Sequence, residues 1–144
     1  MSILKVENLN VFYGNIQALK GINLKIEKGE VVSLIGANGA GKTTTLQTIS
    51  GLLDAKEGDI FFDEKSIKKE KSFKRVRDGL AQVPEGRRVF NGLSVEDNLM
   101  LGSIASEWSP EQVKTEMDKI YKLFPVLEDR KSQKAGTLSG GEQQ

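Results

Sequence analysis

The chain contains no cysteine and no histidine among its 144 residues. The absence of cysteine excludes disulfides and thiolate metal sites, and the absence of histidine removes the commonest general base. Long hydrophobic runs are missing too, since no stretch approaches about 18 apolar residues and the first residues lack the core of a signal peptide. We therefore expect a protein of a reducing compartment that reaches a membrane only through a partner.

The sequence also lacks a net charge of either sign. Lys and Arg number 21 and Asp and Glu number 20, so no global field draws the chain to nucleic acid. A basic cluster over residues 65–77 is interrupted by Glu70 and followed by Asp78. This pattern favours a solvated helix face over a nucleic-acid patch. The apolar members of the cluster are predicted to form a buried stripe: Ile67, Phe73 and Val76.

What is present is an ordinary globular composition, 38% hydrophobic and 28% charged, with β-rich sequence first. Residues 3–26 are predicted as β-structure, with a turn at residues 13–15. The run from Val31 to Ile35 is typical of a strand covered on both faces of a parallel sheet. Ile60–Phe62 and Leu80–Val83 are predicted as further strands.

Helices are expected after this region. Lys42–Ser50 has helix-compatible content, with Leu46 and Ile49 on one face, and Gly51 suits the left-handed position that follows a helix. Ser94 is expected to cap a helix over residues 95–101. Ser109, followed by a proline and then a glutamine at the third position, predicts a stronger start, and Pro125 ends that helix. Its core positions are predicted to be Val113, Met117, Ile120 and Phe124.

The clearest motif is Gly36-Ala37-Asn38-Gly39-Ala40-Gly41-Lys42-Thr43, which fits the phosphate-loop pattern at every constrained position. The glycines let successive backbone N–H groups curl around phosphate oxygens, and Lys42 opens a helix whose N-terminus favours anions. The pattern predicts ATP at residues 36–44, with Thr44 at its end. The Lys42 ammonium is expected at the β- and γ-phosphates, and the Thr43 hydroxyl on Mg²⁺.

A second motif, Leu138-Ser139-Gly140-Gly141-Glu142, resembles the signature sequence of the ATP-binding cassette (ABC) family. By itself, Ser-Gly-Gly is typical of a flexible turn, but its place about a hundred residues after a phosphate loop is specific to that family. The resemblance implies a head-to-tail dimer, with a second ABC subunit of the same or another kind. In that dimer the signature loop of each subunit covers the γ-phosphate held by the other.

Further residues match the family. Tyr13 falls where the family has an aromatic that stacks on adenine; without that context it would be a strand aromatic in a core. The segment from Val83 to Phe90, followed by Leu93-Ser94-Val95-Glu96, resembles the second ATP-binding subunit of branched-chain amino acid importers. Glu85 stands where most members have a Gln that ligates Mg²⁺. It is either a carboxylate ligand of that Mg²⁺ or a solvated loop residue.

The resemblance implies an α/β P-loop fold of the ABC ATPase type. We expect an antiparallel β-subdomain over residues 1–30, part of a parallel core over 31–92, and part of a helical subdomain over 93–144. Family members continue beyond the signature to a Mg²⁺-binding Asp, a catalytic Glu and a γ-phosphate-sensing His. No catalytic residue of this kind is identified here, so we expect the 144-residue chain to bind nucleotide with little hydrolysis, and to self-associate through an open sheet edge.

The resemblance also implies partners and a location. These are polytopic membrane permease subunits, an extracellular or periplasmic binding protein acting indirectly, and a peripheral position on the cytoplasmic face of the membrane. Two alternatives stay open: a nucleotide-binding fragment that hydrolyses nothing, and a soluble ABC ATPase that acts in repair or translation.

Overall fold

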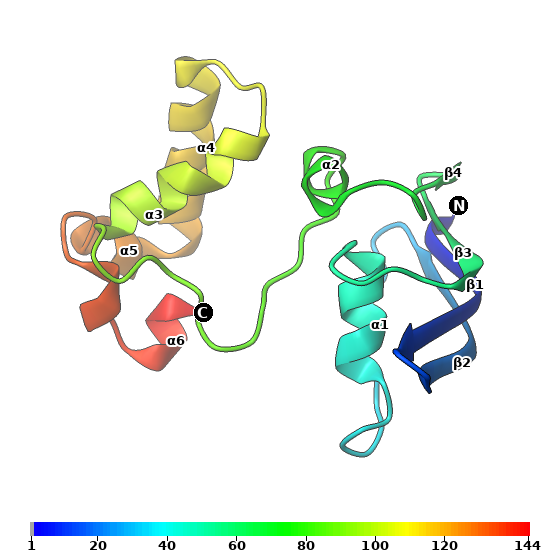
Figure 1. The fold of residues 1–144 in the computed structure, drawn as a ribbon. Coiled ribbons are helices and arrows are strands. Elements are labelled where there is room, and N and C mark those ends of the chain that lie inside the picture. The colour runs from blue at the N-terminus through cyan, green and yellow to red at the C-terminus, as the bar shows by residue number, and fades with distance from the viewer. Residues whose placement is uncertain (1) are drawn as a thin grey trace. The chain divides into compact units, whose positions relative to one another are not determined.

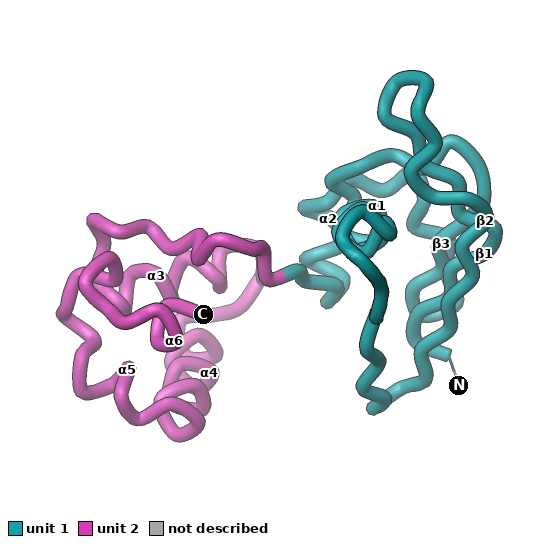
Figure 2. The backbone as a smooth tube through the Cα atoms, turned by 90° about the horizontal axis from the view of Figure 1, so that it is seen from below, with its two compact units in different colours: residues 1–82 teal, residues 83–144 magenta. Residues whose placement is uncertain are grey.

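The computed structural model describes residues 2–144, which divide into two compact units after Gln82 (Figure 2). The first unit carries the phosphate loop and the second carries the signature sequence. The α/β character predicted from the sequence is confirmed. The boundaries predicted at residues 31 and 93 stay predictions.

The first unit is built on a four-stranded antiparallel sheet (Figure 1). Its elements are β1 (Ser2–Tyr13), β2 (Ile16–Glu27), α1 (Lys42–Ile49), β3 (Glu57–Phe62), β4 (Lys65–Ser66) and α2 (Ser72–Arg77). The strand order is β2-β1-β3-β4, so the first strand lies inside the sheet, and Val6 pairs with both Leu24 and Ile60. The β-structure predicted for residues 3–26 and for Ile60–Phe62 is confirmed.

The core of this unit fills one face of the sheet. Alternate residues of β1 point into it, and α1 contributes Ile49. Leu46, predicted to share a face with Ile49, is 47% exposed. The buried members of the core are Leu4, Val6, Leu9, Val11, Leu19, Ile49, Ile60 and Ile67.

The helix α1 begins and ends at glycines with left-handed backbone. Gly41 has φ 87° and Gly51 has φ 79°, so the predicted helix end is confirmed. Threonine is a poor helix former, yet Thr44, Thr45 and Thr48 are all buried here. Two of their hydroxyls are satisfied within the helix: Thr45 Oγ1 donates to Gly41 O at 2.9 Å and Thr48 Oγ1 donates to Thr44 O at 2.7 Å.

Two predicted strands do not form. Residues 31–35 and 80–83 have no regular structure, and Val31 and Ile35 are each 94% exposed. An extended segment becomes a strand only where another backbone pairs with it, and within residues 2–144 no segment pairs with either run. The composition of these segments is apolar, as a buried strand requires, but it does not determine which other backbone segment would pair with them.

The second unit is helical. Its helices are α3 (Val95–Gly102), α4 (Pro110–Leu123), α5 (Pro125–Asp129) and α6 (Gly140–Gln143), with 3₁₀ turns at Ser103–Ala105 and Ala135–Thr137. Ser94 and Ser109 cap α3 and α4 as predicted, and each forms a capping box, Ser94 with Asp97 and Ser109 with Gln112. Pro125 directly follows the α4 cap and is the first residue of α5, so the predicted end of the helix is confirmed.

The core of the helical unit is small. Met117 is buried, Val113 and Ile120 are half-buried, and Phe124 is 56% exposed, so the predicted stripe on α4 is correct except at its last position. Phe124 is the residue that caps α4 and so lies off the helix face. The other buried side chains are Val95, Tyr121, Ala135 and Leu138.

The buried stripe predicted on the basic segment is wrong at two of its three positions. Ile67 is buried, but Phe73 and Val76 are 62% and 41% exposed. The residue of α2 that points inward is Arg75, which is 3% exposed. Its guanidinium finds backbone carbonyls there, and this turns the apolar side chains of the short helix outward.

Candidate nucleotide-binding site

The predicted phosphate loop is an exposed turn that leads into α1. Residues 31–40 are all exposed, and Gly39 and Gly41 both have positive φ, at 83° and 87°. Because α1 begins at Lys42, its first N–H groups have no acceptor within the helix and point toward the loop. An anion placed there would meet backbone donors and the positive end of the helix dipole.

The Lys42 ammonium is fixed by the loop itself. Its Nζ donates to Gly36 O at 2.7 Å and to Ala37 O at 2.8 Å. An ammonium has three donors, so one remains for an acceptor outside the loop. The loop therefore holds the Lys42 ammonium in place and leaves its third N–H available to an acceptor outside the loop.

Gly41 anchors the loop to the sheet. A Cβ built on Gly41 would lie 2.5 Å from Leu19 Cδ2 and 3.3 Å from Ala18 O. Both the left-handed backbone and this close approach demand glycine at this position. No short-range sequence signal indicates that β2 lies beneath the loop, so this contact was missed by sequence reasoning.

The residues after Lys42 differ in access. Thr43 is exposed, so its hydroxyl is available to a metal, whereas Thr44 is buried. Tyr13, predicted to stack on a base, lies at the end of β1 with its hydroxyl 3.3 Å from Thr44 Oγ1. Its side chain is 48% exposed. The structure thus brings Tyr13 together with the start of α1, although 31 positions separate Tyr13 from Thr44.

The signature residues form a capped turn in the second unit. Ser139 is the N-cap of the short helix α6, and its backbone N–H donates to Glu142 Oε2 at 2.8 Å. Arg130 Nη1 lies 3.2 Å from Glu142 Oε1. The hydrogen bonds from Ser139, helped by the Arg130 charge, hold the pKa of Glu142 below its ordinary value. Because Glu142 contacts both Ser139 and Arg130, its carboxylate is engaged within its own chain. Of the other signature residues, Leu138 is buried and Gly141 is exposed.

A basic side chain that sequence reasoning left unassigned covers Gly140. A Cβ built there would lie 2.5 Å from Arg87 Nη2 and 2.6 Å from Arg87 Cζ, so a side chain at this position would have to displace the guanidinium. Arg87 has φ 49°, a left-handed conformation that is uncommon outside glycine. The residue pair Arg87 and Gly140 joins the start of the second unit to the signature turn.

The predicted metal ligands belong to different units. Thr43 lies in the first unit, and Glu85 is an exposed turn residue at the start of the second. Among residues 2–144 there is no group of three or more Asp, Glu, Cys or His side chains that could hold a metal. A Mg²⁺ site here would need a phosphate oxygen to complete it, and the role of Glu85 stays a prediction.

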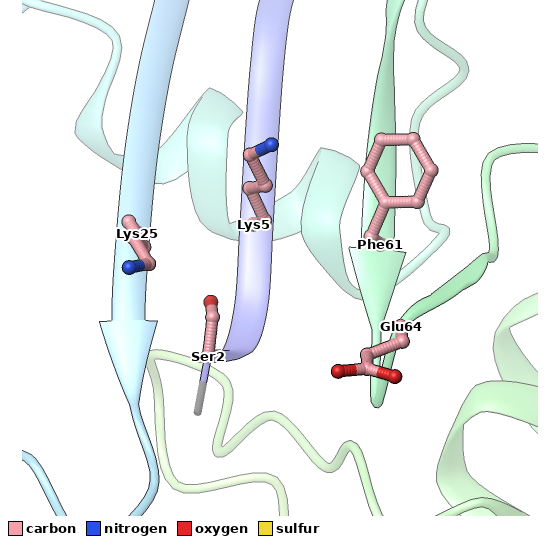
Figure 3. A pocket seen from close by; sticks show the side chains of 5 residues that line it. All are labelled: Ser2, Lys5, Lys25, Phe61 and Glu64. Carbon is pink, nitrogen blue, oxygen red and sulfur yellow. The ribbon is translucent and has the colours of Figure 1, made fainter.

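A hollow of about 450 Å³ on the other face of the sheet is separate from the loop (Figure 3). Lys5, Lys25 and Phe61 form a row across β1, β2 and β3, and Ser2 and Glu64 complete the hollow. Lys5 and Lys25 are each ion-paired with a carboxylate of their own strand. The lysines are therefore compensated, and the hollow lies at the opposite end of β1 from Tyr13.

The phosphate-loop geometry and the signature turn agree with a comparison against known families. Residues 19–144 match the model of the ABC transporter family. The chain belongs to the ABC transporter family. The family match includes the phosphate loop and the signature turn in one continuous span.

Two relatives of this ABC family member are described as transport ATP-binding proteins. It is 45% identical to the high-affinity branched-chain amino acid transport ATP-binding protein BraG of Pseudomonas aeruginosa over 99% of this chain and 60% of that protein. It is 34% identical to a probable branched-chain amino acid transport ATP-binding protein LivF of Archaeoglobus fulgidus over 99% of this chain and 59% of that protein. The chain thus spans about three fifths of the length of these relatives.

Solved structures confirm the P-loop ABC ATPase fold. An ATP-binding cassette of an ABC transporter in its ADP conformation superimposes with a TM-score of 0.75 at 31% identity, over 99% of this chain and 61% of that one. A bacterial ABC transporter cassette solved as a dimer gives a TM-score of 0.82 at 29% identity, over 97% and 65%. Within residues 2–144, no helix has the length and apolar character needed to cross a bilayer.

Proposed function

We propose that this ABC family member binds ATP with Mg²⁺ at residues 36–44. The observation that carries the proposal is the position of the Lys42 ammonium at the N-terminus of α1. It donates to Gly36 O and Ala37 O and keeps a third N–H for another acceptor. A triphosphate supplies the acceptors that this arrangement lacks. The Thr43 hydroxyl, exposed at the same turn, contributes one oxygen to the metal.

We further propose that the protein is the ATP-binding subunit of an importer for branched-chain amino acids. The support is its 45% identity to a subunit with that name and the Val83–Phe90 segment. In this proposal the ATPase pairs with a second ATP-binding subunit, docks peripherally on permease subunits at the cytoplasmic face of the membrane, and serves a binding protein indirectly. The transported side chain is selected by those partners.

The signature turn has a defined task in such a pair. Ser139, Gly140 and Gly141 would face the γ-phosphate held by the partner's phosphate loop, offering a hydroxyl and backbone N–H groups beside the Arg87 guanidinium. Glu142 would act within its own chain, since its carboxylate already accepts the Ser139 N–H. The solved dimer of a similar cassette supports a paired arrangement.

Affinity purification from membranes tests the transport proposal. We expect the tagged chain to co-purify with two polytopic membrane proteins, and a tagged Lys42→Ala variant to serve as a control for association that does not need nucleotide. Recovery of ribosomal or DNA-repair components in place of membrane proteins would instead support the soluble alternative. Phosphate release measured on the same purified sample separates a hydrolysing subunit from a nucleotide-binding fragment.

A further inference from the structure

Arg75 has an unusual environment for a charged side chain on a surface helix. It is 3% exposed, while its α2 neighbours Phe73 and Val76 face solvent. Burial lowers its pKa from the ordinary value, and the charges of Glu70 and Asp54 act in the opposite sense. Burying a guanidinium is costly unless its donors are satisfied, so the contacts of Arg75 indicate what the burial achieves.

The Arg75 guanidinium donates its hydrogen bonds to backbone carbonyls. Nη1 donates to Thr48 O at 2.9 Å and to Ile49 O at 2.7 Å, both in the last turn of α1. Nε donates to Glu70 O at 3.0 Å and Nη2 donates to Lys68 O at 3.2 Å, both in the turn before α2. The planar guanidinium thus ties two backbone segments together and places its charge at the negative end of α1.

The backbone is shaped to admit this side chain. Gly51, the residue that ends α1, lies directly under the guanidinium, and a Cβ built there would approach Arg75 Nε to 2.9 Å. A second polar contact supports the same end of the helix, because Ser50 Oγ donates to Gln82 Oε1 at 2.5 Å. The C-terminal end of α1 is therefore held by two residues that follow it by more than twenty positions.

We propose that Arg75 is a positioning residue for the phosphate loop. This inference rests on the proposed binding of ATP at residues 36–44. The N-terminal end of α1 is located by the Gly41–Leu19 approach and the Tyr13–Thr44 contact, and Arg75 fixes the direction of the helix axis from the other end. The helix has eight residues, about 12 Å at 1.5 Å per residue, so a tilt of about 10° about its middle moves each end by about 1 Å.

A displacement of that size matters at the loop. Lys42 and Thr43 stand in the first turn of α1, and their contacts with phosphate and metal tolerate errors of about half an ångström. Loss of Arg75 removes a donor from four carbonyls and lets α1 tilt about its middle, which moves Lys42 and Thr43 at its first turn. The structure therefore connects a residue of α2 to the affinity for the triphosphate.

The test compares Arg75→Met, Arg75→Lys and Lys69→Met. Methionine keeps an apolar stem without donors, and lysine keeps the charge but cannot reach both backbone segments together. Lys69 is exposed in the turn before α2, so its replacement removes a nearby charge without touching α1. ATP affinity is measured by calorimetry with Mg²⁺ at a temperature where melting curves show each variant fully folded, together with amide hydrogen exchange over residues 42–51.

We expect Arg75→Met to weaken ATP binding about tenfold and to speed exchange in the last turn of α1, Arg75→Lys to lie between it and the wild type, and Lys69→Met to match the wild type. A folded Arg75→Met protein that binds ATP within twofold of the wild type, even with a lower melting temperature, overturns the proposal. So does an equal loss in Lys69→Met. If Arg75→Met does not fold, Arg75→Lys decides by the same criterion. If the wild type itself does not bind ATP, the proposed nucleotide site fails first.

Discussion

At the scale of single residues, the site depends on side chains fixed by backbone carbonyls. Lys42 is held by two carbonyls of its own loop and Arg75 by four carbonyls of two segments. The identity of Lys42 was predictable because its motif is local. The burial of Arg75 was not predictable, because its acceptors Thr48 O and Ile49 O lie 27 and 26 positions away and backbone carbonyls leave no signal in the sequence.

Tyr13 carries a prediction of its own. Replacing Tyr13 with Ala should weaken ATP binding by about 1–3 kcal/mol, the usual contribution of base–aromatic stacking. Tyr13→Phe should retain most of the affinity, because the ring rather than the hydroxyl contacts the base, and the Thr44 contact at 3.3 Å is weak. Competition with a fluorescent ATP analogue measures both. Equal losses in the two variants would assign the effect to the hydroxyl instead.

At the scale of elements, local signals predicted most helix ends and missed the pairing of strands. The Ser94 and Ser109 caps, Gly51 and Pro125 all act within one turn of themselves, and each was identified correctly. The runs at 31–35 and 80–83 were predicted as strands from composition, and they form none. Strand formation requires a partner backbone, which the composition of a single segment cannot supply.

The capping box of α3 predicts a dependence on pH. Asp97 accepts hydrogen bonds from the Ser94 hydroxyl at 2.6 Å and the Ser94 N–H at 3.2 Å, and these lower its pKa. A carboxylate with a lowered pKa in the folded state stabilises the fold above its unfolded pKa, about 3.9. That contribution is lost as the pH falls through the folded pKa.

Urea unfolding between pH 7 and pH 3 measures the effect. The wild type should lose more stability across this range than Asp97→Asn, which has no charge to lose. Asp118→Asn, an exposed position in the middle of α4, serves as the matched control and should behave as the wild type. Equal acid sensitivity in the wild type and Asp97→Asn would show that the capping box does not carry the pH dependence.

At the scale of the whole molecule, the chain exposes apolar residues that its composition marked for burial. Val31 and Ile35 are each 94% exposed, beside the phosphate loop in sequence. Such a segment presents unpaired backbone and apolar side chains together, which favours association of one chain with another. We expect the double variant Val31→Thr, Ile35→Thr to scatter less light than the wild type at the same concentration.

Static light scattering on a dilution series checks this expectation, with Val83→Thr as a control at an exposed apolar residue outside the segment. If the double variant associates as much as the wild type, residues 31–35 do not mediate the association.

The family, the phosphate loop and the signature turn were identifiable from short motifs. The antiparallel sheet beneath the loop was predictable as β-structure, but its order and the Gly41–Leu19 contact required the fold.

The central claim is that an amide-lined turn with one fixed ammonium binds the triphosphate of ATP. Calorimetry of ATP binding with and without Mg²⁺, on the wild type and Lys42→Ala, tests it most directly. We predict measurable binding that Mg²⁺ strengthens, and a loss of about 1.5–3 kcal/mol in Lys42→Ala, the scale of a charge-assisted hydrogen bond. Equal ATP affinity in the folded wild type and the folded Lys42→Ala variant would contradict the account.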